Sequence, residues 1–327
     1  MKFTSICKLL TGAALLAAGA AQASTLSAMY VFGDSLSDAG NNTIVLGGPQ
    51  AQVVTGNSYI PTFTYAPSGT YSNGSVWATG FGSAMGMTVT PSLAGGTNRA
   101  FGGARTAVTP SMGFPPSVAA QVSGLLTARG GVLDSQALYV VAGGGNDARD
   151  TLNNAAMIAG AGGNPSALIA AAAAQYAMDV GLMVDSLQGA GVKYIVVWNT
   201  PNLGLAPAVT VNGAGIAGLG TGIASAMNLA LAARLASEVD VISFDLFGLL
   251  TDVVARPAMY GMGNVTDACG AIMGCDPATA LFWDGIHPTS GGHALLVAAM
   301  QAAVPEPAAL WLVAGALGLL LVQRRRA

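Results

Sequence analysis

The stretch YVFGDSLSDAGNN, residues 30–42, changes from apolar to polar within a few positions. Its first three residues predict a buried strand, which Gly33-Asp34-Ser35 would end. In an open parallel sheet, ligands bind beyond the carboxyl ends of the strands, so we expect Ser35 to lie in such a crevice. There its hydroxyl could act as a nucleophile or merely cap the helix expected to follow. Position alone favours the cap, and only a base elsewhere in the chain would favour the nucleophile.

Other apolar runs resemble the one before Gly33, and helical segments alternate with them. The runs lack the polar alternation of a half-exposed strand, which is typical of strands buried on both faces. The predicted strands are Ala28–Phe32, Ala137–Ala142, Tyr194–Trp198 and Val239–Phe244. The predicted helices are Ser75–Met85, Ser117–Arg129, Ser166–Gln188, Ile223–Glu238 and Gly291–Ala303. This alternation predicts the α/β class, with a central parallel sheet covered on both faces.

Composition restricts the domain count and the partners. The chain has 327 residues, 52% of them hydrophobic and 8% charged, with a formal net charge of -3. Its 12 Lys and Arg residues include the terminal Arg324, Arg325 and Arg326, which leaves no basic stripe to follow a phosphate backbone. Nucleic acid is therefore excluded as an expected partner. Residues 24–303 contain no charge run, proline-rich linker or repeat, so we expect a single domain there.

Residues 1–23 have the pattern of a secretory signal peptide. Lys2 and Lys8 come before the apolar segment Leu9–Ala21, and Ala21-Gln22-Ala23 forms a small-x-small cleavage pattern before Ser24. The mature protein is therefore predicted to be exported, to a compartment in which disulfides persist.

Residues 304–327 have a second set of targeting features. Pro305-Glu306-Pro307 leads into the apolar segment Ala308–Val322 and then into the terminal arginines. At about 1.5 Å per residue this segment is short for a bilayer span, and its basic end favours the cytoplasmic side. The tail resembles the PEP-CTERM sorting signal of Gram-negative bacteria. The resemblance implies a short transmembrane helix that anchors the protein in the inner membrane until a sorting protease of the exosortase type processes it. The destination would be the cell envelope or the extracellular space, and a plain C-terminal membrane anchor is the alternative.

A base for Ser35 is available near the end of the chain, where both histidines lie. Asp284 precedes His287 by three residues, and such a pair can touch in a turn, which lets the carboxylate orient the imidazole and stabilise its charged form. Brought opposite Ser35, the pair would complete a nucleophile, a base and an orienting acid for acyl transfer. His293 has no nearby acid and begins the last predicted helix, so we interpret it as structural.

Acyl transfer also requires donors for a developing oxyanion, and two glycine turns offer them. One is Asn98–Ala104, which contains Gly102-Gly103. The other follows the predicted strand Ala137–Ala142 and ends in the amide side chain of Asn146. Either turn could direct N–H groups toward the strand ends, although each alone is a commonplace loop. Asp34, Asp38 and Asn41 we interpret as local turn and cap residues.

Four blocks taken together resemble the sequence blocks of the GDSL or SGNH ester hydrolases, in that family's order. They are Gly33–Ser37, Asn98–Ala104, Gly145–Asp147 and Asp284–Pro288. The resemblance implies a flavodoxin-like three-layer α/β/α sandwich for residues 24–303. It also implies an exported serine esterase or lipase that needs no metal and no organic cofactor.

The same resemblance assigns roles to residues. Ser35 would be the nucleophile, His287 the base and Asp284 the acid that orients the base. The oxyanion would be held by the N–H groups of Ser35 and Gly103 and by the side-chain amide of Asn146. The block leaves Gly102 as an alternative to Gly103.

Two other motifs suggest different chemistry. Cys269 and Cys275, with the histidines, suggest a zinc site, but their five-residue gap exceeds the usual zinc-finger spacing, so a disulfide that braces the segment before Asp284 is favoured. Gly213-Ala-Gly215-Ile-Ala-Gly218 matches a dinucleotide fingerprint without a convincing strand before it.

The ester substrate is expected to be a lipid, a small ester or an acylated polysaccharide, and the residues do not distinguish among these. The alternative function is a catalytically idle scaffold that acts as a binding protein of the envelope or extracellular matrix.

Overall fold

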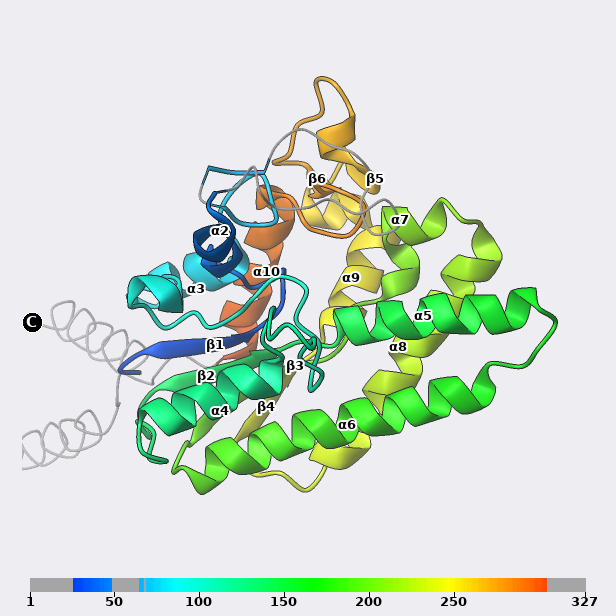
Figure 1. Cartoon of the computed structure of the whole chain (residues 1–327). Coiled ribbons are helices and arrows are strands. Elements are labelled where there is room, and N and C mark those ends of the chain that lie inside the picture. The colour runs from blue at the N-terminus through cyan, green and yellow to red at the C-terminus, as the bar shows by residue number, and fades with distance from the viewer. Residues whose placement is uncertain (1–25, 49–64, 68, 305–327) are drawn as a thin grey trace, which may run out of the picture.

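The computed structural model describes residues 26–48, 65–67 and 69–304 (Figure 1). The predicted signal peptide, residues 1–23, lies outside the described residues. So does nearly all of the predicted sorting signal, because the described part ends at Val304. The other two gaps, residues 49–64 and 68, fall between Asn41 and Pro116, where the sequence is rich in Gly, Ser, Thr and Pro.

Four strands form a parallel sheet in the order β1-β2-β3-β4. They are β1 (Met29–Gly33), β2 (Leu138–Ala142), β3 (Tyr194–Trp198) and β4 (Val241–Phe244). All four predicted strands are therefore confirmed, with ends that shift by up to two residues. The shared direction brings all their carboxyl ends to one edge, where Ser35 follows β1.

A further extended segment, not predicted as a strand, lies along the free edge of β1. The N–H of Val31 donates to Thr97 O at 3.3 Å, Arg99 N–H to Val31 O at 2.7 Å, and Phe101 N–H to Gly33 O at 3.1 Å. The bridge between Val31 and Asn98 is parallel. Because this segment comes between β1 and β2 in the chain, the spatial order becomes 2-1-3-4-5, which is the flavodoxin-like order.

Alternate residues of each strand are buried in different cores. Phe32, Tyr139 and Val141 face one core, together with Ile195 and Val197. The other core takes their strand neighbours, which are Met29, Val31, Leu138, Val140, Ala142, Val196 and Trp198. Both faces of the sheet are therefore apolar and covered, as a three-layer sandwich requires.

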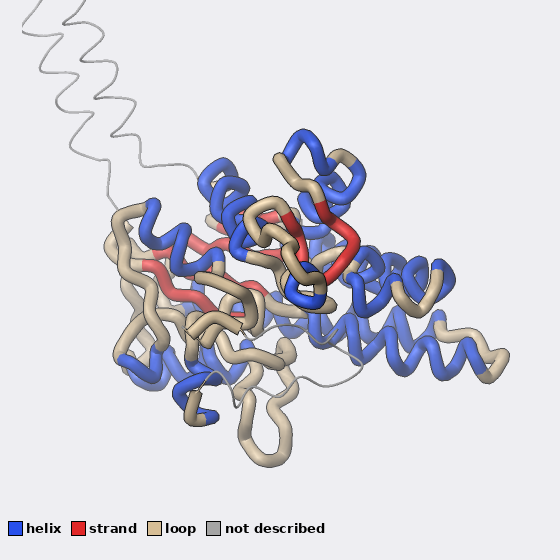
Figure 2. The backbone as a smooth tube through the Cα atoms, turned by 90° about the horizontal axis from the view of Figure 1, so that it is seen from above, coloured by secondary structure: helices blue, strands red, loops and turns tan. Residues whose placement is uncertain are grey.

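Helices supply the outer layers (Figure 1). One face is covered by α4 (Val118–Ala128), α5 (Gly145–Gly160), α6 (Ser166–Gly189) and α8 (Ala214–Leu235). The other is covered by α3 (Trp77–Ala84), α10 (Ser290–Ala303) and the start of α9 (Leu246–Ala255). The long helices extend beyond the edge of the sheet (Figure 2).

The remaining elements are short. They are α2 (Asn41–Leu46), α7 (Pro207–Thr210), the 3-10 turns Ser92–Ala94, Leu203–Leu205, Pro257–Tyr260 and Cys269–Ala271, and the strands β5 (Asn264–Ala268) and β6 (Ala280–Phe282), which pair in parallel. Within the described residues, α6 and α8 have the length and apolar composition of membrane-spanning helices. Both contribute buried residues to the core on one face of the sheet. Core helices of soluble proteins can have the same length and apolar composition.

The prediction from sequence gave too little helix in three places. Helix α8 begins nine residues before the predicted Ile223, in a glycine-rich segment with poor helix propensity. Packing explains one of these glycines: a Cβ on Gly220 would lie 3.2 Å from the backbone nitrogen of Gly204, so the helix and the preceding 3-10 turn approach closely there. Helices α5 and α9 were not predicted, and α5 begins directly in the glycine turn that contains Gly145.

Candidate active site

Ser35 lies in a tight turn after β1 and caps no helix. Residues Ser37 and Asp38 donate their N–H groups to Asp34 O at 3.0 Å each, which closes the turn. Helix α2 begins only at Asn41. The carboxylate of Asp38 caps it, because it accepts from Gly40 N–H at 2.8 Å and Asn41 N–H at 2.6 Å. The structure therefore does not support the cap, which was the alternative to the nucleophile, and the Ser35 hydroxyl has another partner.

The Ser35 hydroxyl points to His287, and His287 points to Asp284. The Nε2 atom of His287 lies 2.7 Å from Ser35 Oγ, and its Nδ1 atom lies 2.7 Å from Asp284 Oδ2. Ser35 is 7% exposed, His287 1% and Asp284 0%. A carboxylate only accepts hydrogen bonds, so the proton of the neutral ring belongs on Nδ1, and Nε2 presents its lone pair to the hydroxyl.

The loop that carries Asp284 and His287 is rigid by its own hydrogen bonds. Asp284 Oδ1 accepts from Ile286 N–H at 2.8 Å and from His287 N–H at 2.7 Å. The loop is closed where Trp283 N–H donates to His287 O at 2.7 Å. The three-residue spacing therefore holds the ring on the carboxylate within one turn, as predicted from the sequence.

Two tyrosines that the sequence analysis missed complete the surroundings of this pair. Tyr65 donates its hydroxyl to Asp284 Oδ2 at 2.7 Å, and the ring of Tyr71 lies 5.2 Å from that of His287. Both come from the Gly-, Ser- and Thr-rich interval, where no periodicity marks them. Only the tertiary structure, which brings residue 65 next to residue 284, could reveal them.

Of the expected oxyanion donors, Ser35 and Asn146 both line the pocket around the Ser35 hydroxyl. Asn146 is the second residue of α5, and its Nδ2 donates to Ala104 O at 2.9 Å, which fixes the amide and leaves a second N–H available. The Ser35 N–H, on the same pocket wall, donates to no acceptor within the described chain.

Hydrogen bonding in the Asn98–Ala104 turn distinguishes Gly103 from Gly102 as the oxyanion donor. The N–H of Gly102 donates to Asp38 Oδ2 at 3.0 Å, so it is occupied. Gly103 is not among the residues that line the pocket of Ser35, but its N–H donates to no acceptor among the described residues. Its φ of 82° lies in the left-handed region that favours glycine. Gly103 is therefore the better candidate donor.

A buried polar network holds this turn against β1. Asn41 Nδ2 donates to Asn98 O at 2.8 Å and to Ala100 O at 2.9 Å, and Asn42 Nδ2 donates to Gly102 O at 3.0 Å. Asn98 Nδ2 returns a hydrogen bond to Ser37 O at 2.7 Å. Asp38 and Asn41 are thus more than the local turn residues predicted, because they join segments about sixty positions apart.

Charged groups also line the pocket. Burial raises the pKa of Asp34 to about 6, although Leu36 N–H at 3.0 Å from Oδ1 and the nearby His287 and Arg149 favour the charged form. Arg149 lies on α5 beside Asn146 and makes no ion pair within the described chain. Asp147, by contrast, accepts from Thr106 N–H at 3.0 Å and ties α5 to the loop after Gly103.

The remaining sequence motifs do not join this site. His293 is buried and its Nδ1 accepts Trp77 N–H at 3.1 Å, which is a structural contact at the start of α3. Gly213 is the N-cap of α8 and comes shortly after the helix α7, so the fingerprint lacks the strand that a nucleotide site needs. Among the described residues, no cluster of three His, Cys, Asp or Glu side chains could hold a metal ion.

Cys269 and Cys275 are joined as a disulfide in the structure, with Cα atoms 5.4 Å apart. Their small loop contacts the segment before Asp284, because Gly270 N–H donates to Trp283 O at 2.8 Å. Cys269 also packs against Trp283, with Tyr65 at the edge of the same cluster.

Comparison with known proteins identifies a matching family and several similar proteins. The family model described as GDSL-like Lipase/Acylhydrolase matches residues 29–300. Esterase EstA of Pseudomonas aeruginosa and esterase EstA of Pseudomonas putida are each 31% identical over 336 residues, which covers 87% of this chain and 48% of the relative. A Pseudomonas putida protein described as an uncharacterized protein in the trpE-trpG intergenic region is 29% identical over 308 residues, with 84% and 48% covered.

The chain spans about half the length of these curated relatives. The family match begins at the first residue of β1 and ends within α10, so it includes the whole sheet, the Ser35 turn and the Asp284–His287 loop. The chain belongs to the GDSL-like lipase/acylhydrolase family.

Proposed function

We propose that the protein is a serine hydrolase that cleaves carboxylic esters through an acyl-enzyme. The observation that carries this proposal is the continuous hydrogen-bonded row from Ser35 Oγ through His287 to Asp284, with 2.7 Å at both steps. The esterase names of the relatives support the same reaction class.

In the first half-reaction, Ser35 Oγ attacks the ester carbonyl carbon and its proton passes to His287 Nε2. Asp284 stabilises the imidazolium that forms and keeps the ring in place. The carbon–oxygen bond to the alcohol then breaks, and His287 returns the proton to the leaving oxygen. In the second, His287 takes a proton from water as the water oxygen attacks the acyl carbon. The bond from that carbon to Ser35 Oγ then breaks, His287 returns the proton to Ser35 Oγ, and the acid leaves.

The negative oxygen of each tetrahedral intermediate would rest on the N–H groups of Ser35 and Gly103 and on the Asn146 amide. These donors are fixed before substrate arrives, because Asn146 is held by Ala104 O and the Gly102-Gly103 turn by Asp38. Fixed donors need no reorganisation during the reaction, which is why such sites contribute strongly to rate.

Labelling with a fluorophosphonate tests this proposal directly. Ser35 Oγ should displace fluoride and form a bond to phosphorus, so mass spectrometry of digested protein should find the adduct on Ser35. Ser35→Ala should not label, whereas Ser123→Ala, at an exposed serine of α4, should label as the wild type does. A folded protein that hydrolyses no p-nitrophenyl ester and never labels at Ser35 would instead support an idle scaffold with a binding role.

Export and sorting complete the proposal. Residues 1–23 would direct secretion, and the tail after residue 303 would anchor the protein in the inner membrane until an exosortase-type protease releases it. The pattern of these segments and the Cys269–Cys275 pair support an oxidising, extracytoplasmic destination. Fractionation of cells that produce tagged protein tests it: tagged protein confined to the cytoplasm, with residues 1–23 still attached, would contradict export.

A further inference from the structure

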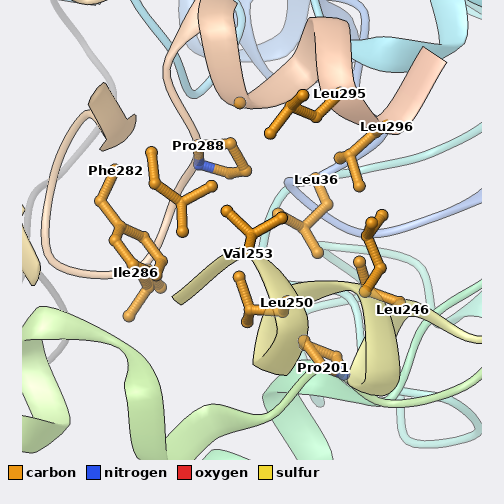
Figure 3. Close-up of a pocket in the computed structure, with 13 residues that line it drawn as sticks. Leu36, Pro201, Leu246, Leu250, Val253, Phe282, Ile286, Pro288, Leu295 and Leu296 are labelled. Atoms are coloured by element: carbon orange, nitrogen blue, oxygen red, sulfur yellow. The ribbon is translucent and has the colours of Figure 1, made fainter. Parts of the chain in front are cut away.

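The second cavity of interest lies behind Ser35, between α9, α10 and the end of β6. The space between its lining atoms is about 510 Å³, and this figure includes open solvent. Every lining residue is Leu, Ile, Val, Phe, Pro or Gly, so the walls offer no side-chain hydrogen bond and no charge. Figure 3 shows Leu250 and Val253 of α9 facing Leu295 and Leu296 of α10 across it.

This apolar pocket adjoins the site of Ser35. Five residues line both, and they are Leu36, Pro201, Leu250, Phe282 and Ile286. Leu36 directly follows the proposed nucleophile, and Ile286 directly precedes the proposed base. A group bonded to Ser35 Oγ would therefore lie close to the apolar side chains that the two pockets share.

We propose that this pocket binds the acyl chain of the substrate, so the enzyme prefers esters of apolar, medium- to long-chain carboxylic acids. The inference rests on the proposed ester hydrolysis and names its substrate class. An apolar wall stabilises hydrocarbon by removing it from water, and it gives nothing to a sugar ring or a polar acyl group.

The acyl part fits this pocket better than the alcohol part for a chemical reason. The alcohol has to leave before water can attack, whereas the acyl group stays covalently bound to Ser35 between the two half-reactions. A pocket whose wall begins at the residue after Ser35 suits the part that remains. The alcohol then occupies the more polar side, where Asn202 and Arg149 line the site of Ser35.

The test measures kcat/KM for soluble p-nitrophenyl esters from acetate upward in chain length. For the wild type, kcat/KM should rise roughly threefold to fourfold for each methylene that enters the pocket, until the pocket is full. A parallel series of alkyl acetates, in which only the alcohol grows, should show a much weaker dependence. A chain-length effect confined to the alcohol series would overturn the acyl assignment.

Variants at Leu295 locate the effect. Leu295 lines the apolar pocket and not the site of Ser35, and it is partly exposed on α10. Leu295→Trp should shorten the preferred chain and lower the decanoate-to-acetate ratio of kcat/KM by about tenfold or more, since several methylenes lose their place. Leu295→Ala should move the optimum to longer chains. If the Trp variant does not fold, the Ala variant alone decides.

The matched control is Leu229→Trp, at a leucine that is 70% exposed on α8, and it should leave the decanoate-to-acetate ratio unchanged. An unchanged ratio in both folded Leu295 variants would refute the pocket assignment while acetate hydrolysis at Ser35 still supported the proposed function. Loss of all ester turnover and of Ser35 labelling in the wild type would refute the proposed function itself.

Discussion

His287 and His293 lie six residues apart on either side of the start of α10, and both are buried, with exposed fractions of 1% and 2%. Their partners differ completely. His287 has a carboxylate on Nδ1 and a hydroxyl on Nε2, each at 2.7 Å. His293 accepts a backbone N–H on Nδ1, and its Nε2 has no partner within the described chain. Burial alone therefore does not make a histidine a catalytic base.

The partner on Nδ1 decides what the other nitrogen can do. At His293 the Trp77 N–H takes the lone pair of Nδ1, so the proton must lie on Nε2, and that atom has no lone pair for a base to use. Desolvation, with a smaller contribution from His287, also lowers the pKa of His293 to about 3, which keeps the ring neutral. At His287 the carboxylate reverses the tautomer and compensates the charge that catalysis creates.

Removal of the partnered histidine should have the largest effect. His287→Ala should lower kcat/KM for p-nitrophenyl acetate by about 10⁴-fold or more, because Ser35 then loses its base and the other members of the unit cannot replace it. The thermal unfolding midpoint, measured on the same preparation, shows whether the fold is kept. A folded His287→Ala protein within tenfold of wild-type activity would remove His287 from the mechanism.

Asn146→Ala tests the electrostatic half of the site, which needs no proton transfer. The expected loss is about 10²–10³-fold in kcat, the usual effect of deleting one oxyanion donor. KM should change little, because the donor acts on the charged intermediate and not on the bound ester. Asn153→Ala, at an exposed position two turns along α5, is the matched control and should keep full activity. If kcat falls less than threefold in Asn146→Ala, another group holds the oxyanion.

His293→Ala should produce the opposite result from His287→Ala. It removes the acceptor of Trp77 N–H and leaves a cavity in the interior, so the free energy of unfolding should fall by ~3 kcal/mol. The kcat per folded molecule should stay near the wild-type value. Urea unfolding and active-site titration on one sample separate the two quantities, and a lost kcat with unchanged stability would give His293 a catalytic role.

Asp34 sets a pH dependence of stability at the same site. Its pKa is raised from 3.8 to about 6 by burial, so the folded state binds the proton more tightly than the unfolded state. The stability from the protonated form is therefore complete below pH ~4 and is lost as the pH rises through about 6, a loss of about 3 kcal/mol from this group.

Asp34→Asn should flatten this decline in urea unfolding measured between pH 4 and pH 8. Asp134→Asn is the control of opposite sign: the hydrogen bond from Ser27 lowers the pKa of Asp134, so its contribution is lost as the pH falls. An identical pH profile for wild type and Asp34→Asn would mean that Asp34 titrates normally.

Much of the fold could be predicted because buried parallel strands leave a local pattern. The runs at β2 and β3 are continuously apolar, and packing on both faces requires that. The segment from Thr97 to Phe101 escaped prediction because it begins with three polar residues and lacks the continuous apolar run of the other strands. The prediction for helix α8 was too short because its glycines lower the local helix propensity, and the contact of Gly220 with Gly204 cannot be read from that propensity.

The candidate site likewise has parts that could be predicted from the sequence and parts that could not. Asp284 and His287 could be paired from sequence because three residues separate them and one turn joins them. The bond from Asp38 to Gly102 and the hydroxyl of Tyr65 could not, because each depends on how distant segments pack. The apolar pocket escaped for the same reason, since it is formed where α9 and α10 face each other.

Tyr65 extends the row of hydrogen bonds that distinguishes His287 from His293. Its hydroxyl donates to Asp284, the proposed orienting acid of His287. Its hydroxyl shares Asp284 Oδ2 with His287 Nδ1, so Tyr65→Phe should leave the carboxylate less firmly held. The expected result is a fall of roughly tenfold in kcat, in proportion to one hydrogen bond to a charged group. KM should stay constant if Tyr65 acts only through Asp284. Tyr194→Phe, at a partly exposed position on β3, should change neither quantity. A rise in KM with unchanged kcat would instead place Tyr65 in contact with the substrate, and no change at all would show that the Asp284 loop needs no support beyond its own backbone hydrogen bonds.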